Sequence, residues 1–362
     1  MTSHRQLGIA VVGYGAISRR HTEILASEGQ YLRWVVGRRP EPTAAFAREY
    51  GFAKHGTDLR MALDDPAVDA VMLCTPNQCH AAQTAACLEA CKHVFVEIPL
   101  AMNYLEGKSL AEMARDRGLT LMVGHTTRFH ESMIRAREEV VSGRLAIDSV
   151  IARWTLMRRQ NVGSNGYVRS WTDSLLWHHG QHATDTVLWL LGIDEVDQVD
   201  VTATFSLPDA RQGVPLDLAL VLRTRCDQLA TVAVTHNSFV KICDFVLMGR
   251  EQTLVIDDAV LRNQDRTLHQ PVDDDSRLRQ DREFLAAVRD GRPASVSGHS
   301  VLPALQVLQI AQNTYDAWRP AGATHPERPH SAIRSGSTRD ADGDAPPSIV
   351  GRPPSVADGG SA

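Results

Sequence analysis

GIAVVGYGAIS, residues 8–18, is the stretch that decides the fold, because it has the pattern of a buried strand, a tight turn and a helix start. Gly13 permits the turn, and Gly15 lets the backbone approach a pyrophosphate at the positive end of the following helix. Ser18 replaces the third glycine of the usual pattern. Placed after the first strand of a β-α-β unit, the turn favours dinucleotide binding over a purely structural bend. The predicted contacts in this loop are Gly13, Tyr14, Gly15, Ala16 and Ile17.

Residues 7–125 alternate between short apolar runs and amphipathic stretches. The apolar runs predict strands buried on both faces, over 7–12, 32–36, 70–73, 94–96 and 120–123. The periodicity between them predicts helices near 16–28, 41–50, 58–64, 78–91 and 103–117. Alternating units of this length are typical of a parallel, doubly wound sheet. We therefore predict an α/β protein whose first domain, residues 1–125, is a Rossmann domain that binds the dinucleotide.

The pattern changes after Val123. Helices are predicted near 130–142 and 173–191, and strands near 149–156, 197–206, 216–224, 228–236, 243–248 and 252–257. Alternating apolar and polar residues indicate a large, mostly antiparallel open sheet with one covered face. Closing helices near 278–290 and 299–318 complete a second α/β domain, residues 126–319, for substrate binding and oligomerisation. Residues 320–362 are rich in Pro, Gly, Ser and charge, so we expect a disordered tail.

The composition is that of an ordinary globular protein, with 43% hydrophobic and 22% charged residues among 362. A formal charge of −5 without any basic run argues against nucleic acid or a membrane surface as partner. No signal peptide or membrane-spanning pattern is found, which predicts a cytoplasmic protein. The six cysteines contain no C-x-x-C pair and are interpreted as buried apolar residues in a reducing compartment.

The end of the second predicted strand, Gly37-Arg38-Arg39, bears on the choice of cofactor. NAD enzymes usually place Asp or Glu here to accept hydrogen bonds from the ribose 2′-hydroxyl. Arg38 and Arg39 instead offer two guanidinium groups to a 2′-phosphate, and no carboxylate is there to repel it. The alternative is a solvated basic turn. We predict NADP as the cofactor.

Further stretches resemble one protein family. Residues 74–80 are CTPNQCH, residues 96–100 are VEIPL, and Arg128-Phe129 precedes His182 and Asp185. They are similar to the T-P-N-x-x-H, Glu-Lys-Pro and Arg-Phe motifs and to the active-site helix of the glucose–fructose oxidoreductase and inositol dehydrogenase family (Gfo/Idh/MocA). The resemblance implies a Rossmann domain followed by an α/β domain with a large open sheet. It adds to the predicted cofactor contacts Thr75, Pro76, Asn77, His80 and Glu97.

Two catalytic positions depart from the family's pattern. Ile98 stands where the family has a lysine, and His178 stands where it has an aspartate four residues before the histidine. An ammonium group beside the substrate oxygen is therefore absent, which argues against the family's sugar-alcohol mechanism. Residues 97–101, 123–129 and 169–179 (RSWTDSLLWHH) are similar to a narrower branch of the family. That branch uses NADP to oxidise a carboxylated cyclic hemiacetal to a pyrone dicarboxylate during protocatechuate breakdown.

His178 and His182 lie four residues apart on one face of a predicted helix, and Asp185 continues that face. Histidine titrates near neutrality, so His182 is predicted to accept the hydroxyl proton as hydride leaves the same carbon. The predicted role of His178 is to orient His182, relay the proton or bind substrate. Two alternatives stay open. One is a zinc site, for which no third ligand with suitable spacing is found, and the other is histidines with packing or surface roles only.

A dianionic substrate needs cations to bind it. Arg128 and Arg169 are the preferred carboxylate clamps, because a planar guanidinium matches a carboxylate bidentately. Each alternatively forms a structural ion pair, for example Arg169 with Asp173. Trp171 packs against the nicotinamide or the flat product ring or, equally, in the core. The remaining predicted substrate contacts are His125, His179 and Asp185.

These residues together favour a dehydrogenase of an acidic lactol, whose ring oxygen stabilises positive charge at the carbon that loses hydride. Oxidation of a sugar, cyclitol or dihydrodiol is an alternative, which Ile98 and His178 disfavour. A non-catalytic NADP-binding sensor is another. The family further suggests a homo-oligomer formed through the open C-terminal sheet, whereas the strand pattern indicates only that one sheet face needs covering.

Overall fold

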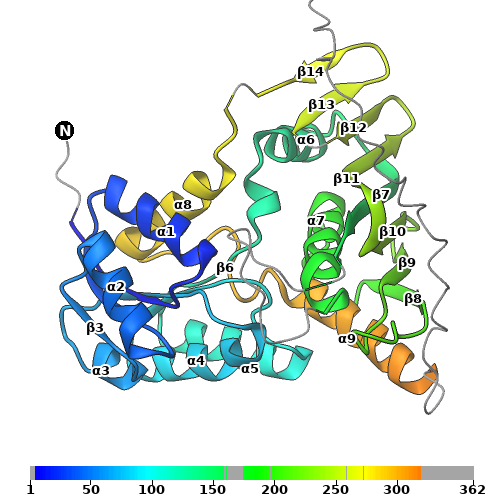
Figure 1. The fold of residues 1–362 in the computed structure, drawn as a ribbon. Coiled ribbons are helices and arrows are strands. Elements are labelled where there is room, and N and C mark those ends of the chain that lie inside the picture. The colour runs from blue at the N-terminus through cyan, green and yellow to red at the C-terminus, as the bar shows by residue number, and fades with distance from the viewer. Residues whose placement is uncertain are drawn as a thin grey trace, which may run out of the picture. The chain divides into compact units, whose positions relative to one another are not determined.

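The computed structural model describes residues 5–158, 160, 174–195, 197–257, 259–271 and 273–318. The predictions made for Arg169, for Trp171 and for the tail from Pro320 fall outside these residues. Within them the chain forms two β-sheets, each accompanied by helices (Figure 1).

The first sheet, as far as the described residues show it, is parallel and doubly wound. Its strands lie in the order β3-β2-β1-β4-β5-β6, so the winding reverses between β1 and β4. The strands are β1 (Gly8–Val12), β2 (Tyr31–Val36), β3 (Lys54–Gly56), β4 (Ala70–Leu73), β5 (His93–Val96) and β6 (Leu121–Val123). The helices are α1 (Ala16–Ser27), α2 (Pro40–Tyr50), α3 (Leu59–Leu63), α4 (Asn77–Glu89) and α5 (Tyr104–Asp116). Ligands of such sheets bind beyond the carboxyl ends of the strands, where Gly13, Cys74 and Glu97 lie.

The second sheet has the strand order β14-β13-β12-β11-β7-β10-β9-β8, and only β7 and β10 run parallel among its described neighbours. Its strands are β7 (Ile147–Met157), β8 (Val199–Phe205), β9 (Asp217–Thr224), β10 (Leu229–Thr235), β11 (Asn237–Gly249), β12 (Thr253–Asp257), β13 (Val260–Asn263) and β14 (Thr267–His269). The helices of this half of the chain are a 3-10 helix (Thr126–Phe129), α6 (Glu131–Val141), a π-helix (Leu176–Gly180), α7 (Gln181–Leu191), α8 (Ser276–Asp290) and α9 (Leu302–Trp318), of which α8 packs against α1 and the 3-10 helix. The predicted α/β class, a Rossmann sheet plus a mostly antiparallel open sheet, is confirmed.

One face of the second sheet is covered by helices. α6 packs against β12 and β13, α7 against β7 and β10, and α9 against β8 (Figure 1). Along β9, Leu218, Leu220 and Leu222 are buried, whereas Val221 between them is 49% exposed. This period of two is the pattern of a strand with one face in the core, so the predicted alternation is confirmed.

The hydrophobic pattern missed three short strands. β3, β13 and β14 contain three or four residues each, too few for a period of two to be recognised, and backbone pairing with a neighbour determines them. β11 begins at Asn237 instead of the predicted residue 243, because it continues through a bulge opposite β7 between Asn237 and Ile242.

The predicted helix 173–191 contains a turn of π-helix before α7. Gly180 donates its backbone N–H to the carbonyl of Leu175, five residues earlier, at 2.9 Å. A Cβ at Gly180 would lie 3.1 Å from that carbonyl oxygen and 3.2 Å from the side chain of Leu218 on β9. The glycine therefore lets the wide turn pack against the sheet. Such turns are frequent at functional sites, and this one carries His178 and His179.

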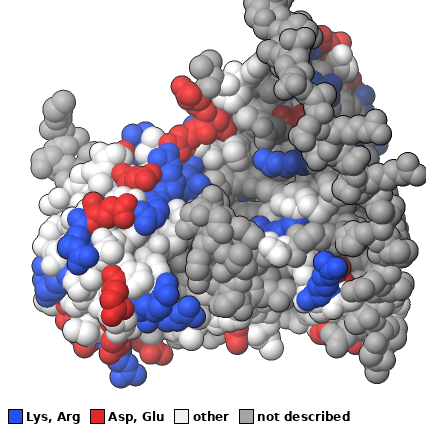
Figure 2. Space-filling model, viewed as in Figure 1, with Lys and Arg blue, Asp and Glu red and all other residues white. Residues whose placement is uncertain are grey.

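The surface of the Rossmann domain carries charges of both signs. Figure 2 shows basic and acidic side chains interspersed on the face in view. Some form ion pairs, such as Arg282 with Glu28 at 2.8 Å. Among the described helices, none has the length and apolar composition needed to span a bilayer.

Candidate active site

The turn between β1 and α1 fits a dinucleotide phosphate. Gly13 has a φ of 118°, and a Cβ there would lie 2.6 Å from the carbonyl oxygen of Cys74, so only glycine fits. A Cβ at Gly15 would meet no described atom within 4 Å. Gly15 precedes α1, whose first turn has neither a capping side chain nor an acidic residue within the described chain. The first N–H groups of α1 therefore suit a pyrophosphate.

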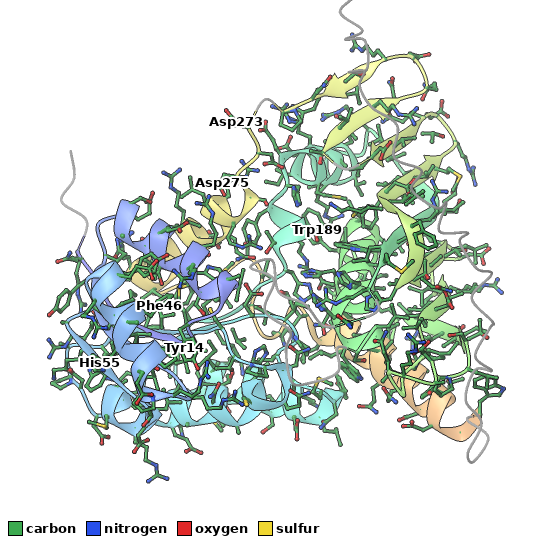
Figure 3. The ribbon with its side chains drawn as sticks, viewed as in Figure 1. Tyr14, Phe46, His55, Trp189, Asp273 and Asp275 are labelled. Carbon is green, nitrogen blue, oxygen red and sulfur yellow. The ribbon has the colours of Figure 1, made fainter. Side chains whose placement is uncertain are left out.

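The two predicted arginines stand at the end of β2. Arg38 and Arg39 are exposed, and Arg39 Nε donates to the Tyr14 hydroxyl oxygen at 3.4 Å. The ring of Tyr14, which is labelled in Figure 3, packs on Gly37. A Cβ on Gly37 would lie only 2.4 Å from that ring. α2 begins with Pro40-Glu41-Pro42, and its two prolines have no backbone N–H. An anion at this helix start would take most of its hydrogen bonds from guanidinium groups.

His80 connects two loops of the predicted cofactor site. It is buried, and its ring nitrogens lie 2.7 Å from the carbonyl oxygen of Pro99 and 2.9 Å from that of Thr75. Thr75 Oγ1 donates to Gln83 at 2.6 Å, while Pro76 and Asn77 begin α4. His80 therefore holds the loop after β4 against the loop after β5, and its effect on a cofactor is exerted through them.

Five histidines gather around the start of α7. We call His125, His178, His179, His182 and His236 the histidine cluster. Trp154 of β7 stacks on His182 with ring centroids 5.5 Å apart and 14° between the planes. The ring of His125 meets His182 edge-on at 5.7 Å, and His178 lies 6.2 Å from it. The structure thus brings together His178 and His182, as their spacing in the sequence predicts.

His182 has the chemical state that a proton acceptor requires. It is half-buried, and its Nδ1 has no hydrogen-bond partner among the described residues. Burial, followed by the neighbouring His125 and His178, lowers the pKa of His182 well below its ordinary value, and Glu97 partly opposes them. The imidazole is therefore neutral at pH 7, which is the form that accepts a proton.

Arg128 and Asp185 form an internal ion pair. Both were expected to contact substrate, but Arg128 Nε and Nη2 bind the two oxygens of Asp185 at 2.8 and 2.6 Å. Asp185 is fully buried, and Arg128 is 8% exposed. A buried carboxylate needs an opposite charge, and Asp185 uses the guanidinium for that purpose. The geometry therefore favours the alternative of a structural ion pair over a substrate clamp.

His125 completes this internal network. Its Nδ1 lies 3.1 Å from Asp185 Oδ2, and Gln181 Nε2 lies 3.2 Å from its Nε2. Burial lowers the pKa of His125 to about 4, although the charge of Asp185 raises it in part. The neutral ring then accepts from Gln181 at Nε2, while its Nδ1, although near the carboxylate, makes no hydrogen bond within the described residues. His125 remains in edge contact with His182, as a neighbour of the predicted base.

His179 also has an internal partner. Its Nδ1 lies 2.8 Å from His236 Nε2, and both residues are buried. Burial and the surrounding histidines lower the pKa of His179 far below its ordinary value. The ring of His178 stacks on that of His179 at 4.2 Å. These contacts assign His179 to the wall that supports His178, whereas the sequence predicts a substrate contact.

Glu97 belongs to a second group of charges. His21 of α1 is fully buried, with Nδ1 2.7 Å from Asp281 Oδ2 and Nε2 2.9 Å from Glu97 Oε1. Burial lowers the pKa of His21, but the charges and hydrogen bonds of Asp281 and Glu97 overcome this effect and raise it to about 9. Burial likewise raises the pKa of Glu97, and its hydrogen bond with His21 outweighs burial and lowers it to about 2. The pair is therefore ionised at pH 7.

Arg277 is a cation near both groups. It follows the first residue of α8, and its charge lowers the pKa of both Glu97 and His182. Its buried Nε has no hydrogen-bond partner within the described part of the chain. Arg128 is already paired with Asp185. Arg277 is therefore a guanidinium within the described chain that could bind an anionic substrate.

The sequence interpretation missed several of these residues, namely His21, Trp154, His236, Arg277 and Asp281. For His21 a signal existed, because it shares the buried face of α1 with Ser18, Thr22 and Leu25. A histidine on such a face needs a buried partner. For Asp281 no local signal existed, because its contact with His21 spans 260 residues of sequence. Within the described residues, no three His, Cys, Asp or Glu side chains are grouped as metal ligands.

The fold and the glycine turn define the class of protein, an oxidoreductase with a dinucleotide-binding Rossmann domain. Residues 7–125 match the model of the GFO/IDH/MocA oxidoreductase family with its NAD-binding Rossmann fold. Residues 131–263 match the model of the C-terminal domain of bacterial oxidoreductases. The chain belongs to the Gfo/Idh/MocA oxidoreductase family.

Known relatives differ in substrate. The chain is 34% identical over 317 residues to 4-carboxy-2-hydroxymuconate-6-semialdehyde dehydrogenase of Sphingobium sp. strain SYK-6, covering 83% of this chain and 96% of that one. It is 25% identical to myo-inositol 2-dehydrogenase of Thermotoga maritima, covering 86% and 97%. Among solved structures, KijD10, a 3-ketoreductase of Actinomadura kijaniata in complex with NADP, has a TM-score of 0.74 at 20% identity, covering 85% and 98%. That last similarity shows the shared fold alone.

Proposed function

We propose that this chain is an NADP-dependent dehydrogenase of the cyclic hemiacetal of 4-carboxy-2-hydroxymuconate-6-semialdehyde, or of a related acidic lactol. With that substrate, the product is 2-pyrone-4,6-dicarboxylate. The observation that carries the proposal is the 34% identity, which extends over 96% of the dehydrogenase acting on this semialdehyde. A second support is Ile98, a buried apolar residue where sugar-oxidising relatives are expected to have a lysine.

The proposed chemistry needs one proton acceptor. The nicotinamide, when bound, accepts the hydride from the lactol carbon. The hydroxyl proton passes to the neutral ring of His182, and the lactol C–O bond becomes the carbonyl of a lactone. The ring oxygen stabilises the positive charge that develops as hydride leaves, so an ammonium at position 98 is not required. His178 and Trp154 keep the His182 ring in place on two sides.

Two arginines are the proposed contacts for the substrate carboxylates. Arg169 keeps this role from the sequence, and it lies outside the described residues. Arg277 takes the place of Arg128, because its charge acts on His182 and its Nε has no partner within the described chain. A guanidinium binds a carboxylate bidentately, which suits a dianionic substrate.

Oxidation of a sugar or cyclitol is the second candidate function. The 25% identity to myo-inositol 2-dehydrogenase over most of both chains favours it. The replacement of the lysine by Ile98 counts against it, since a free alcohol has no ring oxygen on the reacting carbon.

We further propose a homo-oligomer that forms through the open face of the second sheet. A row of side chains crosses that face from β9 to β12, because Val221, Thr231, Ile151, Val246 and Val255 are partners in register. Val221 is 49% exposed and Ile151 is 42% exposed. A second copy of the chain, placed on this row, would remove it from water.

The substrate assignment is tested with the ring-cleavage product of protocatechuate 4,5-dioxygenase. We expect NADPH formation with this compound and at least tenfold lower kcat/KM with myo-inositol or glucose, because both lack carboxylates and myo-inositol also lacks a ring oxygen. NADPH absorbance measures both. Turnover of inositol or glucose, with none of the ring-cleavage product, would show that the second candidate function is right.

Replacing His182 tests the proposed base. We expect His182→Ala to slow single-turnover NADPH formation about a hundredfold or more, whereas His55→Ala, an exposed histidine on β3, leaves it unchanged. Because the pKa of His182 is lowered, the wild-type rate should stay constant as pH falls from about 8 to about 6.5, and decline only below that range. A chemical step within about threefold of wild type in His182→Ala would exclude a base role.

Replacing the arginines after β2 tests the choice of NADP. We expect the double variant Arg38→Ser, Arg39→Ser to raise the KM for NADP⁺ at least tenfold, because two charge-assisted contacts are lost, and to leave the KM for NAD⁺ nearly unchanged. Arg48→Ser, at the exposed end of α2, is the matched control. A wild-type enzyme that prefers NAD⁺ contradicts the assignment.

A charge in the apolar row tests the oligomer. We expect Ile151→Lys to lower the molar mass measured by light scattering to that of a single chain, because a lysine at a subunit contact is costly to desolvate. Val141→Lys, at an apolar residue on α6 that is 71% exposed, should leave the mass unchanged. If the wild-type protein has the mass of one chain, no such interface exists.

A further inference from the structure

Three charged side chains form a row that connects α8, α1 and the end of β5. Asp281 binds His21 through both carboxylate oxygens, at 3.0 and 2.7 Å, and His21 binds Glu97 at 2.9 Å. Each ring nitrogen of His21 thus has a carboxylate partner, which only the doubly protonated ring satisfies as a donor on both sides. Two carboxylates and one imidazolium leave one net negative charge in the group.

His21 is held rigidly in this row. The ring is fully buried and meets the edge of Phe95 at 5.1 Å, and Phe95 in turn packs on Phe284 of α8 at 5.7 Å. A turn of the ring would break two charged hydrogen bonds in a space without water, which is costly. The position of Glu97 Oε1 is fixed accordingly.

The other oxygen of Glu97 lies on the side of the candidate active site. A Cβ on Gly124, the residue after β6, would be 3.0 Å from Glu97 Oε2. The Glu97 side chain is 16% exposed, whereas Asp281 and His21 are fully buried. Glu97 is thus the one member of the row that reaches solvent, and it does so beyond the carboxyl end of β5. In a doubly wound sheet the strands β4 to β6 form the half that receives the second nucleotide of the cofactor.

We propose that Asp281 and His21 are positioning residues that hold the Glu97 carboxylate as a fixed anion beside the nicotinamide, so that the protein binds the oxidised cofactor in preference to the reduced one. The inference rests on the nicotinamide part of the proposed function and is independent of the proposed substrate.

The physical reason is the change of charge on the ring. An oxidised nicotinamide is a cation, and the ring becomes neutral when it accepts hydride. A fixed anion therefore stabilises only the oxidised form, and it does so strongly where the surroundings are poor in water. The other charged or titratable groups that face Glu97 are Arg277, His182, His125, His80 and Cys74. The histidines and Cys74 are neutral at pH 7, so within the described chain Arg277 is the cation that opposes Glu97 on this side.

Binding of the cofactor without substrate is the main test. Kd values for NADP⁺ (calorimetry) and NADPH (fluorescence) are measured for the wild type, Glu97→Gln, His21→Gln and Asp281→Asn. His55→Gln, the same change at an exposed position, is the control. We expect the ratio of the NADP⁺ Kd to the NADPH Kd to rise about tenfold in Glu97→Gln, which removes the anion, and in His21→Gln, where Glu97 loses the partner that keeps it ionised against burial. The rise should be smaller in Asp281→Asn, which keeps a hydrogen-bond acceptor. The control should leave the ratio unchanged.

A purely structural role gives a different result. It would weaken NADP⁺ and NADPH alike and leave the ratio at the wild-type value, and that outcome overturns the inference while the proposed function stands. If the wild type binds neither NADP(H) nor NAD(H), the proposed function fails as well. If NAD(H) binds more tightly, the same ratio is measured with NAD⁺ and NADH.

A second test needs no cofactor. The pKa of His21 lies at about 9, above the ordinary 6.5. Its stabilisation is therefore complete below pH 6.5 and is lost as pH rises through about 9. We expect NMR of the cofactor-free protein to show one buried histidine that stays protonated to about pH 9, and the Tm to fall over this range in the wild type but less in His21→Gln. A His21 that titrates near its ordinary pKa would overturn the fixed-anion arrangement.

Discussion

The need to compensate buried charge is the constraint on which the rest of the candidate site depends. Asp185 is fully buried, and the structure tolerates it because Arg128 binds both its oxygens and His125 lies beside it. His21 is equally buried and lies between Asp281 and Glu97. Removing one partner of such a pair typically costs about 3–5 kcal/mol, because the other charge stays buried without compensation. The two groups therefore fix the elements that carry them.

Burial lowers the pKa of both His182 and His21, but their neighbours lead to opposite results. Around His182 the neighbours are other imidazoles and a tryptophan, so burial prevails and keeps the ring neutral. Around His21 the neighbours are two carboxylates, so the charged form prevails. One residue type thus provides a proton acceptor at one position and a permanent cation at another. Separation of pKa values by environment is how a single fold supports acid–base chemistry near neutral pH.

The sequence predicted what depends on local pattern and missed what depends on distant contacts. The turn at Gly13, the alternating strands and helices, and the closeness of His178 and His182 follow from spacings of a few residues, and the structure has them. The pairing of Arg128 with Asp185 joins residues 57 apart, and nothing in either segment distinguishes an internal guanidinium from an exposed one. Short strands such as β3 are determined by the neighbour they pair with, and a pattern of side chains cannot reveal them.

Ile98 bears on both the row of Asp281, His21 and Glu97 and the histidine cluster. With an apolar residue at that position, residue 98 supplies no ammonium beside Glu97, and the carboxylate shares the charge of His21 with Asp281. An ammonium at residue 98 would pair with this carboxylate and leave little charge for a bound cofactor. The replacement of the family's lysine by Ile98 therefore has two consequences. In the proposed mechanism proton acceptance passes to an imidazole, and in the proposed cofactor site the carboxylate after β5 acts on the nicotinamide.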